Sequence, residues 1–369
     1  MDEIYLGLMS GTSLDAIDVV AVSFEPTLRL WGTHSLLLPA NIREDVLALT
    51  QPYDNEIERL GRVDILLGRL FADCANQLLD KLNLSPSQIT AIGSHGQTIR
   101  HRPDLDTPFT LQITDPNIIA EKTGITVVAD FRRRDVAAGG QGAPLVPAFH
   151  AAILRNNTIN RVVLNLGGMA NITVLPADSS LSVYGYDTGP ANVLMDAWCQ
   201  IILKQAFDKN GAWAATGHVN NALLADMLAH PFFAKRPPKS TGREDFHIDW
   251  LLEFFDGAYP NVLAEDIQAT LLALTAQSVV DAVNQTGFSE GELWLCGGGA
   301  YNKALWQLLA TKLPHYTLHS TEEMGIAPTW LEACAFAWLA KQTLAGFSGN
   351  LPAVTGAIGQ RILGGIFQA

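Results

Sequence analysis

Short hydrophobic runs separated by small and polar residues set the pattern of the first segment. The runs 4–9 and 17–24 flank the octapeptide 11–18, and the second run alternates toward its end. Two strand-like runs joined by a turn of Gly, Ser, Thr and Asp predict a β-hairpin, and 28–38 continues the sheet. Apolar residues then recur at three- and four-residue steps through 57–82, which predicts an amphipathic helix.

Short strands and glycine-rich turns alternate along the next part of the chain. Strands are predicted at 89–93 and at 125–130, and the second leads into the basic run 132–134 and the glycine-rich stretch 139–142.

From about residue 160 the hairpin pattern of the first segment returns. The strands 161–166 and 172–175 flank the small-residue turn 167–171. A long helix is predicted over 264–284. The strand 292–296 runs into the stretch 297–302, which opens with Gly297, Gly298 and Gly299, and then a helix begins. Pro328 can occupy the first turn of a last helix that continues through Ala345.

Composition limits the classes of function. A chain of 369 residues is longer than a typical single domain, which predicts two domains. Hydrophobic residues make up 48% and charged residues 17%, an ordinary globular composition, and the mean hydropathy is +0.15. The formal net charge of −13 argues against a protein that binds nucleic acid or an anionic membrane surface, because such proteins need a basic footprint.

Cysteine usage and the N-terminus indicate a cytoplasmic protein. The four cysteines lie far apart in apolar contexts and are expected to be reduced core residues: Cys74, Cys199, Cys296 and Cys334. The chain begins Met-Asp-Glu without a basic region, so we expect no signal peptide. No apolar run approaches the ~20 residues that a membrane-spanning helix requires.

Three small-residue turns carry the candidate chemistry. The hairpin tips 11–18 and 167–171 present backbone N–H groups and hydroxyls that suit phosphate oxygens. The turn 297–299 follows a strand, and glycine there allows a ligand to approach the backbone closely. Each cluster alone is also explained by an ordinary turn. Three of them in this order favour phosphate binding and resemble the actin-like ATPase and sugar kinase architecture.

The finer motifs resemble the anhydro-N-acetylmuramic acid kinase family over essentially the whole chain. The motifs are GTSLDAID at 11–18, SHGQT at 94–98, DFR at 130–132, GAPLVP at 142–147, NLGGMAN at 165–171, DTGPAN at 187–192 and EA at 332–333. Ala16 and Ala191 depart from typical members, which carry glycine there. Because alanine adopts only negative φ cheaply, we expect negative φ at both positions.

The resemblance implies an α/β fold with two actin-like (ribonuclease H-like) domains and a nucleotide- and sugar-binding cleft between them. The expected domains are 1–130 with 347–369, and 131–346. The implied enzyme is a kinase that uses ATP and Mg²⁺. It opens the 1,6-anhydro ring of 1,6-anhydro-N-acetylmuramic acid with water and phosphorylates O6, giving N-acetylmuramic acid 6-phosphate in peptidoglycan recycling. The implied partner is this small molecule, not nucleic acid or a membrane, and a homodimer is left open.

The resemblance also places the nucleotide contacts. They are Gly11, Thr12, Ser13, Leu14, Asp15, Ala16, Ile17, Asp18, Gly167, Gly168, Asn171, Gly297, Gly298 and Gly299. Asp15 or Asp18 could help to hold Mg²⁺ through water, since this hard ion prefers oxygen ligands. Ser10 stands where related kinases often have Asp, so no residue is assigned as a metal ligand.

Two carboxylates are the candidates for the sugar chemistry. Asp187 follows the strand-like run 183–186 and precedes Thr-Gly-Pro, which indicates a turn and then a helix. By itself it reads more readily as the N-cap of that helix, whereas the resemblance makes it the general base. Glu332 lies in an alanine-rich, apolar helix, where a carboxylate is costly unless it faces a cavity or a partner. We assign Glu332 to sugar binding.

Basic and polar residues after two strand ends complete the candidate site. Arg132 and Arg133 are assigned to the lactyl carboxylate of the sugar, because the arginine fork matches a carboxylate. Arg134 is expected to be solvated, and a solvated surface run remains an alternative for at least one of the three. His95 and Gln97 are assigned to sugar hydroxyls, although a histidine after a strand is often structural.

Other functions stay open on the sequence alone. The nearest is another kinase of the same fold that acts on a different sugar or on a carboxylic acid. An actin-like polymer or regulator would use the nucleotide only as a switch. A glycosidase would use the pair Asp187 and Glu332 but would not need two phosphate-binding hairpins.

Overall fold

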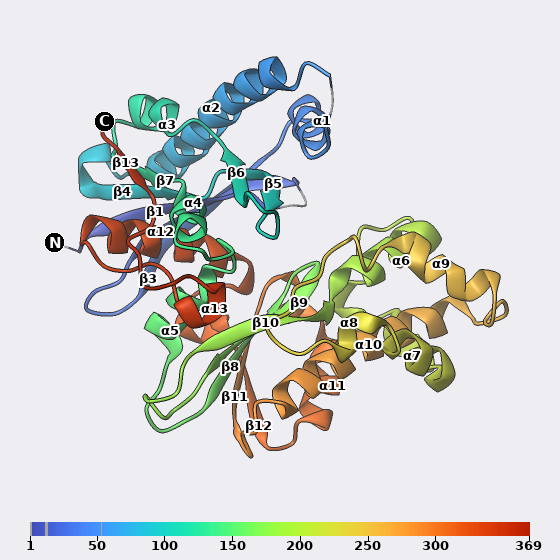
Figure 1. Ribbon diagram of the computed structural model, residues 1–369. Helices are drawn as coiled ribbons and strands as arrows, with labels where there is room; N and C mark the ends of the chain where they lie inside the picture. The colour runs from blue at the N-terminus through green and yellow to red at the C-terminus, as the bar shows by residue number, and fades with distance from the viewer. Residues whose placement is uncertain (1, 12–13, 53) are drawn as a thin grey trace. The chain divides into compact units, whose positions relative to one another are not determined.

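The computed structural model describes residues 2–11, 14–52 and 54–369, and it divides into two compact units. Unit 1 comprises 1–153 and 330–369, and unit 2 comprises 154–329. The two boundaries therefore lie at 153/154 and 329/330 instead of 130/131 and 346/347. Residues 330–346 belong with unit 1 because the helix that follows residue 330 packs on the first sheet, and residues 131–153 belong there as well (Figure 1).

Unit 1 is built on a six-stranded sheet in the order β13-β7-β4-β1-β2-β3. β1, β2 and β3 are antiparallel neighbours, while β4 and β7 run parallel to β1. The strands are β1 (Ile4–Met9), β2 (Ala16–Ser23), β3 (Arg29–Leu37), β4 (Ile89–Ser94), β7 (Val127–Ala129) and β13 (Gly365–Phe367). A separate hairpin pairs β5 (Gln97–Arg102) with β6 (Phe109–Ile113).

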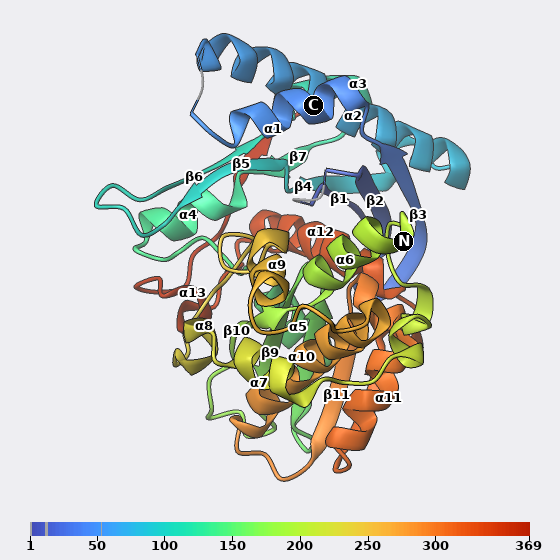
Figure 2. The same cartoon turned by 90° about the vertical axis from the view of Figure 1, so that its right-hand side faces the viewer.

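Helices cover both faces of this sheet. α2 packs on one face and α12 on the other, as the two views agree (Figures 1 and 2). α12 approaches closely because Gly7 and Gly93 leave no Cβ, which would overlap the carbonyl oxygens of Ala333 and Phe336. The helices of unit 1 are α1 (Ala40–Leu49), α2 (Glu56–Leu82), η1 (Pro86–Gln88), α3 (Pro116–Thr123), α4 (Phe131–Ala137), α5 (Val146–Leu154), α12 (Leu331–Leu344) and α13 (Pro352–Thr355).

Unit 2 repeats the strand arrangement of unit 1. Its sheet has the order β10-β9-β8-β11-β12, with β8, β9 and β10 antiparallel and with β11 and β12 parallel to β8. The strands are β8 (Arg161–Leu166), β9 (Met169–Leu175), β10 (Tyr184–Pro190), β11 (Gly291–Cys296) and β12 (Tyr316–Ser320). An antiparallel trio followed by two parallel strands thus occurs in both units, and the predicted actin-like α/β class is confirmed.

The helices of unit 2 gather around the long, buried α10. They are α6 (Asn192–Leu203), η2 (Lys209–Gly211), η3 (Ala214–Thr216), α7 (Asn221–Leu228), α8 (Pro231–Ala234), α9 (Ile248–Asp256), α10 (Ala264–Asn284), η4 (Gly298–Tyr301), α11 (Lys303–Lys312), η5 (Thr321–Met324) and η6 (Pro328–Trp330). α10 contacts α6, α7, α11 and β10, and its apolar residues join the strands of the sheet in one core.

Several sequence expectations meet the structure directly. The helices predicted over 57–82 and 264–284 are α2 and α10. The predicted turn at 188–190 is wrong, because β10 continues to Pro190 and α6 begins only at Asn192. The last helix begins at Pro328 as predicted, but its first turn is the 3₁₀ helix η6, and α12 follows from Leu331.

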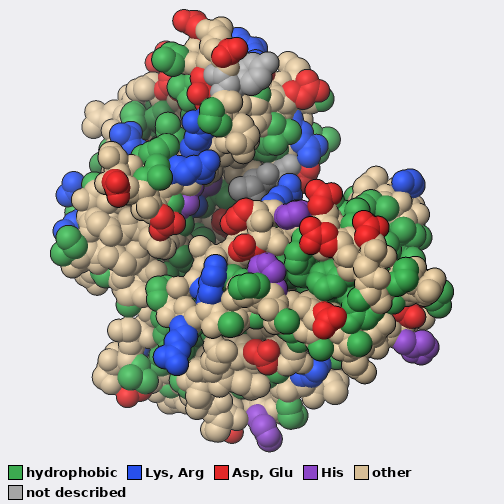
Figure 3. All heavy atoms as spheres, turned by 45° about the vertical axis from the view of Figure 1, so that its right-hand side comes forward, with side chains coloured by type: hydrophobic (Ala, Val, Ile, Leu, Met, Phe, Trp, Pro, Cys, Tyr) green, Lys and Arg blue, Asp and Glu red, His purple; other side chains and the backbone are tan. Residues whose placement is uncertain are grey.

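The surface and the cysteines bear on the expected class of protein. Acidic and basic side chains are interspersed over the visible face of each unit (Figure 3). The four cysteines are buried, and none of them is in a disulfide bond. Among the described residues, no helix combines the length and apolarity that crossing a bilayer requires.

Candidate active site

The first hairpin tip is a tight turn between β1 and β2. The Leu14 N–H donates to the Gly11 carbonyl over 3.2 Å, and Leu14 adopts a φ of 57°. The side chains of Leu14 and Ile17 are 2% and 0% exposed and belong to the core of unit 1. These two residues can therefore offer a nucleotide only their backbone groups. Thr12 and Ser13 lie outside the described residues.

Two carboxylates stand beside this tip. Asp15 is exposed and pairs with Arg43 at 3.7 Å. Asp18 accepts a hydrogen bond of 2.5 Å from the Ser35 hydroxyl, and partial burial raises the pKa of its carboxyl while Ser35 opposes the shift. Ala16 opens the extended strand β2. Among the described contacts predicted here, Asp15 is exposed, whereas Gly11, Ala16 and Asp18 are half-buried.

The second tip is locked to the start of α6. The backbone N–H groups of Ala191 and Val193 both donate to the Gly168 carbonyl, at 2.9 and 3.1 Å. The Asn192 side chain donates to the Gly167 carbonyl over 2.7 Å. Ala191 has a φ of −110°, so the prediction of a negative value there is confirmed. Because these hydrogen bonds hold the carbonyl groups of Gly167 and Gly168, the backbone N–H groups of the tip remain as possible donors to an anion.

The glycine triplet after β11 packs against this second tip. A Cβ on Gly297, whose φ is 78°, would lie 2.5 Å from the Asn165 side-chain oxygen, and one on Gly299 would lie 2.7 Å from the Leu166 Cβ. Gly298 faces open space. Gly297 and Gly299 are thus required by packing, and Gly298 alone is available to a ligand. The helix predicted after residues 297–302 is α11, which begins at Lys303, and the preceding stretch contains the short 3₁₀ helix η4.

Asp187 lies on the same sheet as the second tip. It is the cross-strand neighbour of Asn171, beside an irregularity in the β10–β9 pairing. Its backbone N–H donates to the Lys239 carbonyl, and its carboxylate accepts from the Thr241 N–H at 3.0 Å. Asp187 sits within a strand, and Ala191 precedes α6 without a side-chain cap. The N-cap interpretation of Asp187 is therefore wrong.

The electrostatics of Asp187 suit a general base. Burial raises the pKa of its carboxyl to about 6; the Thr241 N–H lowers it and the like charge of Glu244 raises it further. A carboxylate with this pKa is mostly ionised at neutral pH, yet it holds a proton more firmly than an exposed aspartate. The group can take a proton from water and return it to solvent.

In unit 1, His95 and Arg132 form a contact between the end of β4 and the first turn of α4. The Arg132 Nε and Nη2 lie 3.0 and 2.9 Å from the His95 Nε2, and Nη1 donates to the Gly142 carbonyl at 2.9 Å. Burial lowers the pKa of His95 well below its usual range, and the Arg132 charge lowers it further. The imidazole is therefore neutral, and because Nε2 accepts from Arg132, its proton lies on Nδ1.

Glu332, in the first turn of α12, joins this group electrostatically. Protein atoms around the carboxyl raise its pKa, Arg132 lowers it and Asp18 raises it. Glu332 is nonetheless exposed, although most of its neighbours on α12 are buried. The structure thus brings Asp18, His95, Arg132 and Glu332 together in unit 1.

The remaining candidates in unit 1 differ in exposure. Arg133 and Arg134 are exposed, and Arg133 pairs with Asp130 at 3.4 Å. Gln97 is buried at the start of β5, where its amide N–H donates to the Thr98 carbonyl at 3.2 Å. Arg132 alone of the three arginines turns inward.

Sequence reasoning missed Asp135, which organises the loop beside Arg132. Asp135 is fully buried, and its carboxylate accepts from the Gly142 N–H at 2.8 Å, the Asn350 amide at 2.7 Å and the Thr355 hydroxyl at 2.8 Å. Gly142 in turn presents its carbonyl to Arg132. An Asp placed three residues after a candidate Arg on one short helix was the available signal.

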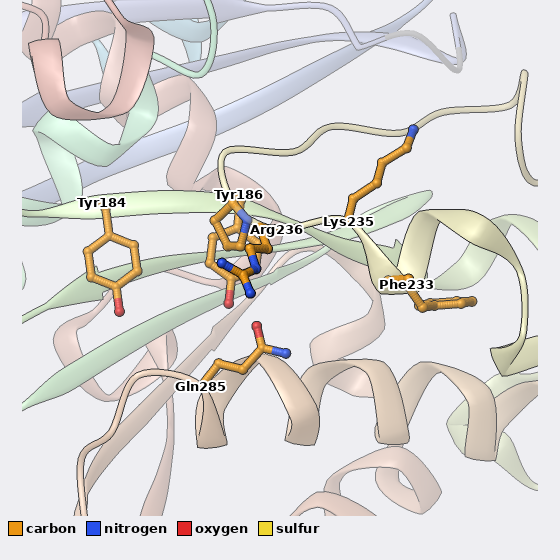
Figure 4. A pocket seen from close by; sticks show the side chains of 8 residues that line it. Tyr184, Tyr186, Phe233, Lys235, Arg236 and Gln285 are labelled. Atoms are coloured by element: carbon orange, nitrogen blue, oxygen red, sulfur yellow. The ribbon is translucent and has the colours of Figure 1, made fainter.

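A pocket of about 400 Å³ in unit 2 contains none of the predicted residues. Figure 4 shows the rings of Tyr184 and Tyr186 on one side of β10, with Arg236 beside Tyr186 and Gln285 pointing up from the end of α10. Lys235 and Arg236 are exposed, and no carboxylate lines the pocket. The pocket therefore supplies no general base for sugar chemistry.

Comparison with known proteins identifies the family. The profile described as anhydro-N-acetylmuramic acid kinase matches residues 3–369. Proteins named anhydro-N-acetylmuramic acid kinase are 51% identical in Acinetobacter baylyi (99% of both chains), 52% in Coxiella burnetii (99% of this chain and 97% of the relative) and 51% in Shewanella oneidensis (99% and 98%).

Similarity to solved structures is more distant. The activator of 2-hydroxyisocaproyl-CoA dehydratase from Clostridium difficile has 12% identity and a TM-score of 0.48, covering 93% of this chain and 97% of that one. A glucokinase of the ROK family from Streptomyces griseus has 13% identity and a TM-score of 0.40, covering 92% and 99%. These likenesses carry no argument, whereas the full-length relatives do. The chain belongs to the anhydro-N-acetylmuramic acid kinase family and is a phosphotransferase.

Proposed function

We propose that this enzyme opens the 1,6-anhydro ring of 1,6-anhydro-N-acetylmuramic acid with water and transfers the γ-phosphoryl group of ATP to O6. The product is N-acetylmuramic acid 6-phosphate, an intermediate that returns cell-wall sugar to metabolism. The observation that supports this reaction best is Asp187, a carboxylate with a pKa of about 6, held at the Thr241 N–H beside the second hairpin tip.

Ring opening precedes phosphoryl transfer in the proposed reaction. The water oxygen bonds to C1 of the sugar, the C1–O6 bond breaks, and a proton of the water passes to the Asp187 carboxylate. The freed O6 attacks the γ-phosphorus in line, and ADP leaves. General base catalysis by Asp187 supplies about 10²–10⁴ of the rate.

The nucleotide is assigned to the hairpin tips and the glycine turn. The Gly167–Gly168 tip offers N–H donors whose carbonyl groups are already held by the start of α6. Gly298 is the open position of the triplet, where the adenosine can lie against the backbone. Fixed N–H donors of this kind stabilise phosphate charge without reorganisation.

Mg²⁺ belongs to the same proposal. Asp15 and Asp18 are oxygen donors next to the first tip, and neither is fully buried. In the described part of the chain no group of three or more His, Cys, Asp or Glu side chains could hold a metal ion. A site with so few protein ligands fits an Mg²⁺ ion that binds together with ATP and keeps several water ligands. When bound, Mg²⁺ neutralises phosphate charge.

Arg132 is assigned to the lactyl carboxylate of the sugar, and Glu332 to its hydroxyl groups. Arg132 is fixed by the Gly142 carbonyl and by His95, so its planar fork is oriented before the ligand arrives. Glu332 accepts hydrogen bonds from neutral donors, whereas it would repel a carboxylate. The opposite charges of these two residues therefore orient the sugar.

The decisive experiment combines product analysis with one substitution. The enzyme, ATP, Mg²⁺ and the anhydro sugar should give a product heavier by one water and one phosphoryl group. Asp187→Asn should lower kcat by about 10²–10⁴, with the sugar neither hydrolysed nor phosphorylated.

Asp245→Asn is the matched control, because Asp245 accepts from the Thr241 hydroxyl in the same loop. It should keep most of the activity. Near-normal kcat in Asp187→Asn would show that another residue is the base, and Glu332 would then be the first candidate. If the wild-type product carried the phosphoryl group without the added water, the proposed ring-opening step would be wrong.

A further inference from the structure

Residues 235–246 form a loop between α8 and α9 that contacts β10 at Asp187. The Asp187 N–H donates to the Lys239 carbonyl at 3.1 Å, and the Asp187 carboxylate accepts from the Thr241 N–H at 3.0 Å. Since β10 is an edge strand of its sheet, the stretch 239–241 lies along a free strand edge. The features that fix this stretch therefore also fix the hydrogen-bond donor to Asp187.

The downstream end of the loop is attached to the core of unit 2. Phe246 is fully buried, and its ring centroid lies 5.7 Å from that of Phe232 and 5.6 Å from that of Phe233. The Phe246 N–H donates to the Gly242 carbonyl at 3.1 Å, which closes a turn just after Thr241. Aromatic packing and this turn hold the second half of the loop.

The upstream half is held in a different way. Residues 235–238 are exposed, and Lys239 is the first half-buried residue of the loop. The Lys239 ammonium donates to the carbonyl groups of Phe232 and Phe233, at 3.4 Å in both cases. Its nitrogen also lies 4.5 Å from the centroid of the Phe232 ring. The Lys239 side chain thus closes the loop back onto α8, from which the loop departs.

The charges around Lys239 explain why it stays in this position. Burial lowers the pKa of its ammonium group, Lys235 lowers it further, and Asp281 raises it. Two carbonyl groups and the face of an aromatic ring replace part of the lost hydration, because each attracts a cation. The pKa of Asp187 depends on burial, the Thr241 N–H and Glu244. The connection from Lys239 to Asp187 is the backbone of 239–241.

We propose that Lys239 is a positioning residue for Asp187: its side chain clamps the loop to α8 and so holds the Thr241 N–H against the carboxylate. The inference rests on the proposed function, in which Asp187 is the general base. Such a base has to lie within hydrogen-bond reach of the water that it deprotonates, and a displacement of about 1 Å can cost ~10²-fold in rate.

The clamp itself can be tested without the reaction. Lys239→Met keeps an unbranched side chain but removes the ammonium group. Amide hydrogen exchange of the full-length protein without ligands, read by mass spectrometry on peptides that cover 239–246, should become about tenfold faster at Thr241, because the loop opens more often.

Lys235→Met is the matched control for this measurement. Lys235 lies over the same Phe232 ring, at 5.8 Å from its centroid, but it is exposed at the start of the loop. Its loss should leave the exchange rate at Thr241 within about twofold of wild type. Equal exchange rates at Thr241 in wild type and Lys239→Met would overturn the proposal.

The effect on the reaction should appear in kcat. Lys239→Met should lower kcat about tenfold and leave KM for ATP within about twofold, because the change concerns the base and not nucleotide binding. Lys239→Arg should recover most of kcat, since a guanidinium can donate to both carbonyl groups and stack on the ring. Lys235→Met should keep the wild-type kcat.

A double-mutant cycle separates positioning of Asp187 from a general structural role. In an Asp187→Asn background the carboxylate is gone, so Lys239→Met should change the residual kcat less than about twofold. A tenfold loss in both backgrounds would overturn the proposal, because Lys239 would then act independently of Asp187. Melting temperatures of all variants verify that the compared proteins are folded.

The two hypotheses fail in different experiments. Near-normal kcat in Asp187→Asn would contradict the proposed function alone, because hydrogen exchange at Thr241 does not involve the reaction. An inactive Asp187→Asn together with unchanged exchange in Lys239→Met would contradict the positioning role alone.

Discussion

The surroundings of Asp187 disfavour the ionised form of its carboxyl group. Burial and Glu244 raise the pKa of its carboxyl to about 6, and the Thr241 N–H offsets only part of that shift. The same surroundings that make it a better proton acceptor than an exposed aspartate also disfavour its charged form in the folded state. Burial and the charge of Glu244 therefore explain both the suitability of Asp187 as a proposed base and its unfavourable contribution to the free energy of folding at neutral pH.

The pH dependence of activity follows from this pKa. Asp187 acts as a base only when ionised, so kcat/KM should fall about tenfold per pH unit below pH 6. Glu244→Gln removes a like charge and should move this acidic limb to lower pH, because the pKa of Asp187 drops. The measurement is a pH–rate profile of both proteins. An unchanged limb would mean that another group controls it.

The stability of the Asp187→Asn variant gives a second check. A carboxyl whose pKa rises from 3.8 to about 6 on folding stabilises the fold below pH 3.8 and loses that contribution as pH rises through 6. Asparagine keeps the shape without the charge, so the variant should be more stable than wild type at pH 7.5, by about 1–3 kcal/mol. The difference should shrink toward pH 4. Thermal melts across this range test it, and a less stable variant at pH 7.5 would mean that the ionised carboxylate supports the fold.

At the scale of elements, the buried carboxylate of Asp135 joins segments that are far apart in the sequence. Asp135 on α4 binds Gly142, Asn350 and Thr355, and so joins residues 139–142 to the segment around α13. Every one of its partners is a donor, which suits a carboxylate and not an amide. Asp135 thereby holds Gly142, whose carbonyl accepts from Arg132, the residue that we propose binds the sugar carboxylate.

Asp135→Asn should therefore lose both stability and sugar affinity. The amide NH₂ faces other donors, and the free energy of unfolding should drop on the order of 3 kcal/mol. KM for the sugar should rise more than KM for ATP, which a general loss of stability would not produce. Asp73→Asn, at an exposed pair with Lys122, is the control and should stay within about 0.5 kcal/mol. Equal changes in both KM values would contradict the positioning role.

Substitutions in the glycine triplet allow an effect on packing, at Gly297, to be measured separately from an effect on ligand contact, at Gly298. Gly297→Ala should destabilise the protein, because φ is 78° and a Cβ would lie 2.5 Å from the Asn165 side chain. Gly298→Ala meets open space and should leave the melting temperature within about 2 °C. If adenosine lies on Gly298, this second variant should raise KM for ATP severalfold and leave the sugar KM unchanged. An unaltered KM for ATP would remove Gly298 from the nucleotide site.

At the scale of the whole molecule, sequence patterns located the strands and long helices but not the partners of each element. The runs at 4–9, 89–93 and 161–166 are recognisable because buried strands need continuous apolar residues. That α12 packs on β1 and β4 depends on the pairing of Gly7 and Gly93 with a helix more than 200 residues away. No local pattern encodes such a contact.

The candidate site was predictable to a similar degree. Asp187, His95, Arg132 and Glu332 were found through motif resemblance, and the structure groups the last three in unit 1. Asp135 and Thr241 were missed because their importance lies in tertiary hydrogen bonds. Such features appear only once the chain is folded.

The domain boundaries offer a test of what each unit needs in order to fold. Unit 2 is a continuous segment, 154–329, with its own core around α10, whereas unit 1 requires α12 from the far end of the chain. A fragment 154–329 should therefore melt cooperatively and show no exposed apolar surface to a hydrophobic dye.

The fragment 131–346, which follows the boundaries predicted from the sequence, should behave differently. It carries α12 without β1 and β4, so Ala333, Phe336 and Ala337, each at most 1% exposed in the whole protein, would face water. Uncovered apolar surface of this kind promotes aggregation. Circular dichroism melts and light scattering of the two fragments decide between the boundaries. A soluble, cooperative 131–346 beside an aggregating 154–329 would assign α12 to the second folding unit, because only partners within that fragment could then cover it.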